Sequence, residues 1–296
     1  MYLKLEGVPS ERQKEFFLSR ARHTAYGGAR GGGKSWAMRR KFILLALAYP
    51  GLNLLLLRRT LPELRENHLI PMQRELYGVA GYNSTERVFV FPNGSRIKLG
   101  YCDSAQDVYQ YQGQEYAVIG LEEATHFTEE QMRFLTTCNR TTRTDIAPRM
   151  YYTCNPGNVG HAWVKRLFID RIYRDGENPG DYLFIPARIY DNRVLLDADP
   201  NYIRQLQASP MSSGARIWTA TGTYTQASSS ASFQGAGMLS IPLSFRHGGE
   251  GSAPWTGATT TPAACCGTQW TARAGSTPIG SCMYGRQGRP TLQGGP

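Results

Sequence analysis

The sequence predicts an α/β domain with a mostly parallel sheet flanked by helices, and three observations support this fold class. Short apolar segments alternate with longer segments of helical periodicity through residues 1–208. Two of the apolar segments, 52–57 and 116–121, are nearly continuous, which is typical of strands buried on both faces. A glycine-rich loop joins the first strand of this region to a helix. Strands that alternate with helices favour a parallel sheet.

Each element is placed by its periodicity and by the residues that end it. The helix over 34–49 ends at Pro50-Gly51, and Thr128 is the expected N-cap of another helix. A β-hairpin insertion is expected where 87–91 and 95–99 flank Pro92-Asn93-Gly94. The remaining expected elements are helices over 13–20, 61–77 and 161–170 and strands over 23–26, 52–57, 116–121, 150–153 and 182–185.

Composition indicates a polyanionic partner and no membrane span. The 296 residues carry a net charge of +10, which suits binding to DNA, although surplus charge also serves solubility. The longest apolar candidate, 42–57, is interrupted by Pro50-Gly51 and Asn53 and is too short to span a bilayer. Without a signal-peptide pattern or a CxxC pair among the six cysteines, the sequence predicts a cytosolic protein with free thiols.

The composition changes near residue 208. The segment 209–296 has five Arg, no Lys and a single acidic residue, Glu250. Gly, Ser, Thr and Pro fill 46 of its 88 positions, and its apolar residues show no periodicity. We therefore expect two parts: a folded domain over 1–208, complete by about residue 190, and a largely irregular, low-complexity tail over 209–296.

The glycine-rich loop fits a phosphate-binding pattern without a mismatch. Residues 28–35 read G-A-R-G-G-G-K-S, which matches G-x-x-x-x-G-K-[ST] between a strand and a helix. Backbone N–H groups of such a loop surround a β-phosphate, Lys34 supplies charge to the phosphates, and the Ser35 hydroxyl is a ligand for Mg²⁺. The alternative is a chance glycine-rich turn. The pattern predicts a P-loop NTPase that binds ATP and Mg²⁺ through Gly28, Ala29, Arg30, Gly31, Gly32, Gly33, Lys34 and Ser35.

Two acidic residues follow the strand over 116–121. Glu122 is placed to hold Mg²⁺, and Glu123 to orient and deprotonate the attacking water. Two carboxylates are needed because the metal and the water must be held separately. The alternative is a solvated helix start, and position 122 is more often Asp in P-loop enzymes, which weakens the metal assignment.

Three further predictions rest on position alone. Arg30, inside the loop, could stabilise γ-phosphate charge as an arginine finger, or could be a solvated loop residue. Thr153-Cys154-Asn155 ends a strand and could report hydrolysis to the next element, although Asn-Pro-Gly is first of all a turn. Gln13 could bind adenine, although a lone Gln usually lies on the surface.

Together these residues resemble the large-subunit family of tailed-phage terminases. The resemblance covers about residues 10–208 and includes Gln13-x-x-Phe16-Phe17, residues 26–35, Leu57-Arg58-Arg59-Thr60, Tyr111-Gln112-Gly113, residues 122–127 and residues 153–165. It implies an ATP-driven motor that moves double-stranded DNA into a procapsid through a portal protein. It also implies a terminase small subunit as partner, a homo-oligomeric ring during packaging, and the host cell cytoplasm as location.

The same resemblance implies roles for the residues named above. Gln13 would recognise adenine, Lys34 and Ser35 would bind phosphate and Mg²⁺, and Arg30 would be an arginine finger in cis. Glu123 would be the catalytic base, and Thr153, Cys154 and Asn155 would couple ATP hydrolysis to translocation. The family also carries a C-terminal, metal-dependent nuclease domain of ribonuclease H type, whose aspartates are not visible in this chain.

A frameshift near residue 208 would explain the missing nuclease. If one nucleotide is lost there, the original codons begin at the third base of each tail codon. Trp218-Thr219 and Trp255-Thr256 then each force GAC, aspartate, in the other frame, at positions where the family pattern has Asp. The alternative is a genuine low-complexity tail. We expect no nuclease activity in this chain.

Two other functions compete with a packaging motor. One is a helicase-like P-loop ATPase, which a strand-separation assay would reveal. The other is a decayed domain that binds nucleotide without turning it over.

Overall fold

The computed structural model describes residues 2–5, 7–28, 30–204, 217–218, 224–225 and 270–273. Its centre is an eight-stranded sheet in the order β4-β5-β6-β3-β7-β8-β2-β9. Neighbouring strands from β6 to β9 are parallel, and β4 and β5 extend one edge in the antiparallel sense. The predicted mostly parallel α/β fold is confirmed. The hairpin is part of this sheet, because its second strand β6 pairs with β3.

The strands agree closely with the predicted segments. Their bounds are β2 (His23–Gly28), β3 (Asn53–Arg58), β4 (Gly81–Asn83), β5 (Val88–Val90), β6 (Arg96–Tyr101), β7 (Val118–Leu121), β8 (Arg149–Cys154) and β9 (Tyr182–Ala187). The amino-terminal ends of β2, β8 and β9 lie side by side in parallel register, since His23 pairs with both Met150 and Tyr182. The carboxyl ends of these strands therefore meet at one edge of the sheet.

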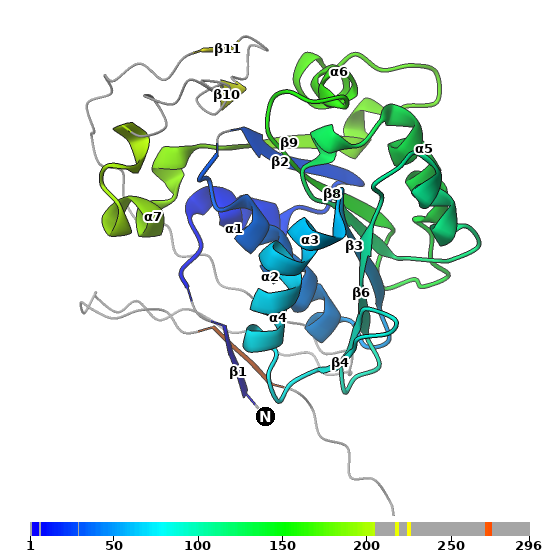
Figure 1. The fold of residues 1–296 in the computed structure, drawn as a ribbon. Helices are drawn as coiled ribbons and strands as arrows, with labels where there is room; N and C mark the ends of the chain where they lie inside the picture. Colours follow the sequence, from blue (N-terminus) through cyan, green and yellow to red (C-terminus); the bar gives the residue numbers. More distant parts are fainter. Residues whose placement is uncertain are drawn as a thin grey trace, which may run out of the picture.

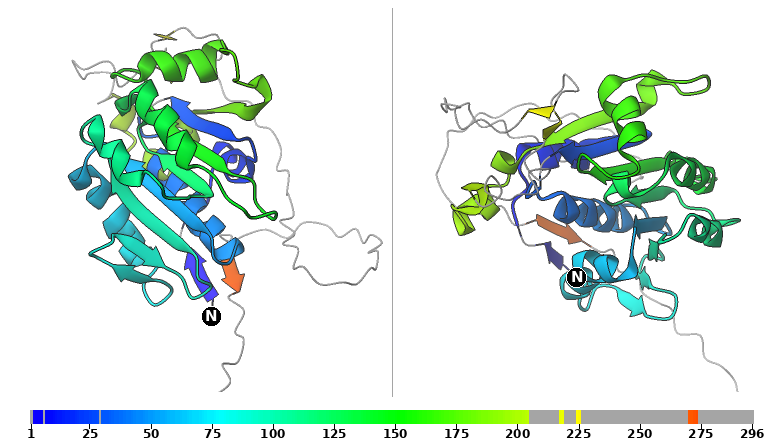
Figure 2. Two further views of the ribbon diagram at one scale, coloured as in Figure 1. Left: turned by 90° about the vertical axis from the view of Figure 1, so that its right-hand side faces the viewer. Right: turned by 45° about the horizontal axis from the view of Figure 1, so that its top comes forward.

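Helices cover both faces of the sheet (Figures 1 and 2). On one face lie α1 (Glu11–Leu18), α2 (Lys34–Ala48), α3 (Leu61–Leu64), the π-helical turn η1 (Arg65–Leu69) and α4 (Ile70–Glu75). On the other lie α5 (Glu129–Cys138), α6 (His161–Val164) and the π-helical η4 (Lys165–Asp170). Strand β3 shows why: Leu54 and Leu56 pack on the first face, Leu55 and Leu57 on the second, and all four are fully buried.

Capping residues fix where two helices begin. Thr128 is the N-cap of α5 as expected. Its side-chain oxygen accepts from the N–H of Gln131, and Oε1 of Gln131 accepts from the N–H of Thr128. Ser10 and Gln13 form the same reciprocal pair at the start of α1. Short 3-10 segments complete the connections: η2 (Gln106–Tyr111), η3 (Ala124–His126), η5 (Pro179–Asp181) and η6 (Ile189–Asp191).

The last part of the domain returns to the loop after β2. Helix α7 (Arg193–Ala198) follows η6. A Cβ atom placed on Gly31 would lie within 4 Å of side-chain atoms of Ile189, Leu195 and Tyr202, so these side chains pack against the loop. Beyond residue 204 the structure describes only three short strands, β10 (Ile217–Trp218), β11 (Tyr224–Thr225) and β12 (Trp270–Arg273). β10 pairs with β11, and β12 pairs antiparallel with β1 (Tyr2–Leu5). The prediction of an irregular tail otherwise falls outside the described residues.

Among the residues that the structure describes, no helix combines the length and the apolar character needed to cross a membrane.

Candidate active site

The glycine-rich loop connects β2 to α2 at the carboxyl edge of the sheet. Gly33, the N-cap of α2, has a φ of 70°, a conformation that glycine adopts without steric cost. Three successive loop carbonyls accept hydrogen bonds from other elements: Gly31 from Asn192 at 2.6 Å, Gly32 from Tyr26 at 3.3 Å, and Gly33 from Gln13 at 3.3 Å. These bonds fix the loop at the N-terminus of α2, and helix N-termini are sites that bind anions. Ala29 lies outside the described residues.

Lys34 is buried beside the predicted acidic residues. The residue is only 8% exposed, and this burial is the main reason that the pKa of Lys34 falls to about 8. The charges of Glu122 and Glu123 oppose this shift, while the charge of Arg30 adds to it. Lys34 therefore lies within electrostatic reach of Arg30 and both carboxylates. Arg30 itself is exposed.

Glu122 lies where β7 ends, between the phosphate loop and β3. Its N–H donates to the carbonyl of Leu57 at 2.8 Å, which continues the pairing of β7 with β3. The side chain is 1% exposed and lies close enough to the Ser35 hydroxyl for the two groups to interact. Burial raises the pKa of Glu122 to about 7, and the nearby Arg58 guanidinium and the Ser35 hydroxyl work in the opposite direction. The structure thus brings together the two predicted metal ligands.

Glu123 is held in an unusual backbone conformation by three neighbours. Its φ of 51° and ψ of 55° place it in the left-handed region, which few non-glycine residues adopt. Its N–H donates to Oγ1 of Thr153 at 3.0 Å. Its carboxylate faces Nη2 of Arg58 at 3.3 Å and Nε2 of His126 at 3.4 Å. These contacts fix the carboxylate at the mouth of the site.

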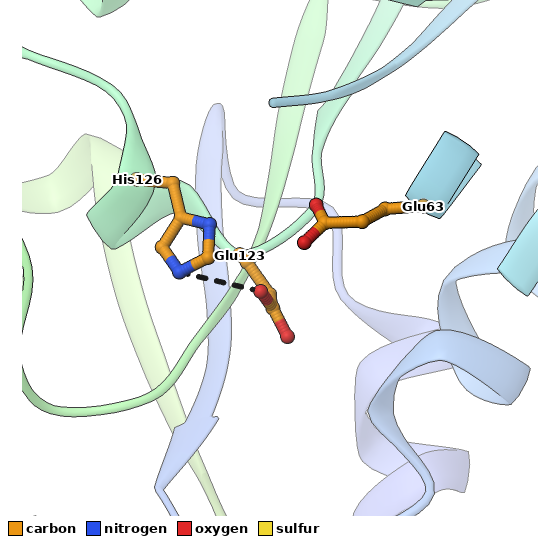
Figure 3. A group of neighbouring side chains, drawn as sticks. All are labelled: Glu63, Glu123 and His126. Carbon is orange, nitrogen blue, oxygen red and sulfur yellow. Dashed lines mark ion pairs between the residues drawn. The ribbon is translucent and has the colours of Figure 1, made fainter. Parts of the chain in front are cut away.

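Figure 3 shows Glu63 of α3, Glu123 and His126 of η3 turned toward one another. One ligand-type atom from each lies within 4.8 Å of the others. Nε of Arg58 also lies 3.2 Å from Glu63, so this guanidinium supplies positive charge to both carboxylates of the cluster. The oxygen donors Ser35 and Glu122 fit Mg²⁺, which prefers hydroxyl and carboxylate oxygens.

The residues at the end of β8 lie next to this site. Thr153 is fully buried and accepts the bond from Glu123. Cys154 is also fully buried, and burial raises the pKa of its thiol to about 12, so Cys154 is a neutral packing residue here. Oδ1 of Asn155 is buried without a hydrogen-bond partner among the described residues. Of the three predicted coupling residues, Thr153 therefore makes the direct link to the acidic residues.

Gln13 lies against the phosphate loop with both ends of its amide engaged. Oε1 accepts from the N–H of Ser10 at 2.8 Å, and Nε2 donates to the carbonyl of Gly33 at 3.3 Å. The side chain is 6% exposed, so it is not a surface residue. Gln13 would have to exchange one of these bonds to contact adenine.

A sequence model of a known family matches most of this domain. The model, described as the N-terminal part of the T4-like type of terminase large subunit, matches residues 25–236. The match covers more than half of the 296 residues. The chain belongs to the terminase large-subunit family. No curated protein sequence matches it.

Solved structures show the same fold in this terminase and in the large terminase from the thermophilic bacteriophage D6E. Crystal form 2 has a TM-score of 0.56 at 16% identity, over 69% of this chain and 52% of that chain. The complex with ADP has a TM-score of 0.55 at 17% identity, over 68% and 50% of the two chains. The complex with ATP-γ-S has a TM-score of 0.54 at 16% identity, over 69% and 51%. The present chain spans about half the length of these structures.

Three residues of the terminase site were missed by sequence reasoning. Arg58 lies at the end of β3 and contacts Glu122, at 3.4 Å, as well as Glu123 and Glu63. It belongs to the Leu57-Arg58-Arg59-Thr60 segment that carried the resemblance, so a signal was present but gave no role. His68 contacts Glu122, and Asn192 contacts the phosphate loop. Their positions in sequence gave no comparable signal.

Proposed function

We propose that this chain is the ATP-hydrolysing motor domain of a terminase large subunit, which moves double-stranded DNA into a viral procapsid. The observation that carries the proposal is the closeness of the Ser35 hydroxyl to the Glu122 carboxylate. It joins a complete phosphate loop to an acidic strand end, with Lys34 buried beside them. The D6E large terminase, which shares this fold, binds ADP and ATP-γ-S in its solved structures.

The phosphates of ATP would lie against the N-terminus of α2. The loop N–H groups and the Lys34 ammonium stabilise negative charge there, in a buried setting where such charge interactions are strong. Ser35 and Glu122 would hold Mg²⁺, which supplies charge neutralisation for the β- and γ-phosphates. The charges of Glu122 and Glu123 both favour the positively charged form of Lys34.

Glu123 would orient and deprotonate the attacking water. Its carboxylate is partly exposed, so water reaches it, while Arg58 and His126 fix its direction. Arg30, exposed at the turn of the loop and within electrostatic reach of Lys34, would stabilise charge that develops on the γ-phosphate. Thr153 would carry the change at Glu123 into β8.

The partners follow from the family and remain proposals. Double-stranded DNA, a portal protein and a terminase small subunit are the expected partners, in a homo-oligomeric ring within the host cell cytoplasm. The net charge of +10 suits DNA. A helicase-like activity is the competing function, and we expect no nuclease activity from this chain.

One experiment tests the motor function. The purified full chain should hydrolyse ATP in the presence of Mg²⁺, with stimulation by blunt duplex DNA, and should not separate the strands of that duplex. Lys34→Ala is the matched negative control. Absence of ATP turnover in the presence of measurable nucleotide binding would contradict the motor proposal, and duplex unwinding would favour the helicase.

A further inference from the structure

His68 is a fully buried histidine on the core-facing side of the helical segment 61–75. It lies between Leu64 and Met72, four residues away from each, and these two neighbours are 1% and 0% exposed. The pattern of this face calls for an apolar residue, because an imidazole without a partner is costly to bury. A histidine at this position therefore needs a partner in the core.

That partner is the carboxylate of Glu122. Nε2 of His68 contacts Oε2 of Glu122, and Nη1 of Arg58 faces Oε1 of the same carboxylate at 3.4 Å. Apart from this contact, neither ring nitrogen of His68 nor Oε2 of Glu122 has a hydrogen-bond partner in the described part of the chain. Glu122 is thus held from two sides, by a residue of β3 and by a residue of the helical segment.

A proline explains how His68 is turned toward Glu122. In a regular α-helix the carbonyl of Asn67 would accept from the N–H of residue 71, but Pro71 has no N–H and its ring crowds that carbonyl. The helix instead makes the π-helical turn η1, in which the N–H of Ile70 donates to the carbonyl of Arg65, five residues earlier. The extra residue in this turn changes the direction of the side chains within it.

The carbonyl released by Pro71 is bound by the phosphate-loop helix. Nη1 of Arg39, on α2, donates to the carbonyl of Asn67 at 2.8 Å, and Nε of Arg39 pairs with Glu75 at 3.0 Å. The turn that carries His68 is therefore fastened to the helix that begins at Lys34. Ser35 and His68 reach Glu122 from two elements that this arginine joins.

We infer that His68 is a positioning residue for Glu122, and that the Pro71 turn and Arg39 hold it in place. By contacting one carboxylate oxygen, His68 restricts rotation of the Glu122 carboxylate and keeps it close to Ser35. The inference rests on the proposed function, since positioning matters only if Glu122 and Ser35 hold Mg²⁺. Residues that orient a metal ligand commonly change metal affinity or activity by about 10–100-fold when they are replaced.

The test compares the affinity of a fluorescent ADP analogue for the full chain in Mg²⁺ and in EDTA. The ratio of the two affinities measures the metal site without requiring turnover. His68→Leu should reduce this ratio by about 10-fold or more, whereas His68→Gln, which keeps a polar nitrogen at a similar distance, should retain most of it. Affinity in EDTA should stay unchanged in both variants and shows that the phosphate loop is intact.

A second pair of variants tests the turn. Pro71→Ala restores the missing N–H, so it should free the Asn67 carbonyl from Arg39, redirect His68 and reduce the ratio in the same way as His68→Leu. Pro62→Ala is the matched control, because Pro62 lies in the first turn of the same helix, where the N–H has no helical acceptor. It should leave the ratio unchanged.

The outcomes separate the two proposals. If His68→Leu keeps the wild-type ratio of affinities in Mg²⁺ and in EDTA, the positioning role is overturned and the proposed function is left intact. Equal losses in His68→Leu and His68→Gln, with normal affinity in EDTA, also overturn it, because the side-chain nitrogen would then be irrelevant. A wild-type chain that binds no nucleotide in either condition overturns the proposed function and this inference with it.

Discussion

The backbone N–H of Glu123 donates to Oγ1 of Thr153, with 3.0 Å between the two atoms. This bond joins the end of β7 to the end of β8, two neighbouring parallel strands. It also helps to hold Glu123 in the left-handed backbone region, where a glutamate is strained. We propose that a change at the nucleotide that moves Glu123 acts on β8 through this bond.

Thr153→Val should separate this link from nucleotide binding. Valine has the same shape but leaves the N–H of Glu123 without its acceptor, which costs about 1–3 kcal/mol for a buried donor. We expect ATP turnover to fall by about 10-fold or more, with little change in nucleotide affinity. Thr153→Ser keeps the oxygen and should stay close to wild type. Equal activity in the valine and serine variants would show that the bond has no catalytic role.

Replacing the two central charged residues should have different effects. Lys34→Ala should abolish ATP hydrolysis, because the site loses its buried positive charge at the phosphates. Glu123→Gln should still bind ATP but turn it over at least ~100-fold more slowly, as expected for loss of a general base. Steady-state turnover and nucleotide titration give both values. Near-normal turnover in the Glu123 variant would move the base to another group, with Glu122 as the first candidate.

Arg30→Ala should lower turnover far more than ATP affinity. Charge on the γ-phosphate develops in the transition state, and an exposed arginine at the turn of the loop can follow it there. Arg30→Lys keeps the charge without the planar fork and serves as the control. If affinity falls and turnover does not, Arg30 is only a ground-state contact to phosphate.

Sequence reasoning located the fold and the phosphate site but not the contacts between elements. Local patterns sufficed for residues 28–35 and for the strands, because a glycine-rich turn and a continuous apolar run carry their own signal. Strand order carries no such local signal. The contacts of Arg58 with Glu122 and Glu123 were therefore visible only in the structure, where β3 and β7 are neighbours. His68 was hidden for a related reason, because its partner Glu122 follows β7 and the arginine that binds its turn, Arg39, lies on α2.

The stability of the domain should depend on pH through His23. This residue stacks on Tyr182, with 4.8 Å between ring centroids, and its Nδ1 lies 2.8 Å from the Tyr152 hydroxyl. Burial lowers the pKa of His23 from 6.5 to about 4. The unfolded chain therefore takes up a proton that the folded chain does not, so stability is fully present above pH 6.5 and is lost as the pH falls toward 4.

Urea unfolding at pH 7.5 and at pH 5 measures this contribution. The His23 share of the loss should be about 2 kcal/mol, since one pKa unit corresponds to about 1.4 kcal/mol. His23→Phe should be less stable at pH 7.5, because the Tyr152 hydroxyl loses its bond with Nδ1 of His23, but should lose less stability between the two conditions. Glu177, whose pKa is lowered to about 2 chiefly by hydrogen bonding to Arg166, acts in a lower pH range. An unchanged pH dependence in His23→Phe would assign the effect to other groups.

The last prediction concerns where the motor domain ends. We expect residues 1–208 to fold and bind nucleotide without the tail over 209–296, whose composition offers little apolar periodicity to offset the loss of chain entropy. The structure moves the functional end later than about residue 190, because Asn192 donates to the carbonyl of Gly31, and Leu195 and Tyr202 pack beside that glycine. The family model extends further, to residue 236, and β12 pairs with β1.

Chains ending at 188, 208 and 236 distinguish these boundaries. The chain ending at 208 should keep the nucleotide affinity of the full chain, whereas the chain ending at 188 should lose it along with the Asn192 contact. Limited proteolysis of the full chain should leave a core of about 200 residues, because a segment that buries little apolar surface is cut first. Affinity that returns only in the chain ending at 236 would place the boundary there.

Sequencing the gene around codon 208 tests the origin of the tail. In the shifted frame, an open reading frame that continues past position 296 with acidic nuclease motifs would support a frameshift. An early stop codon in that frame would contradict it.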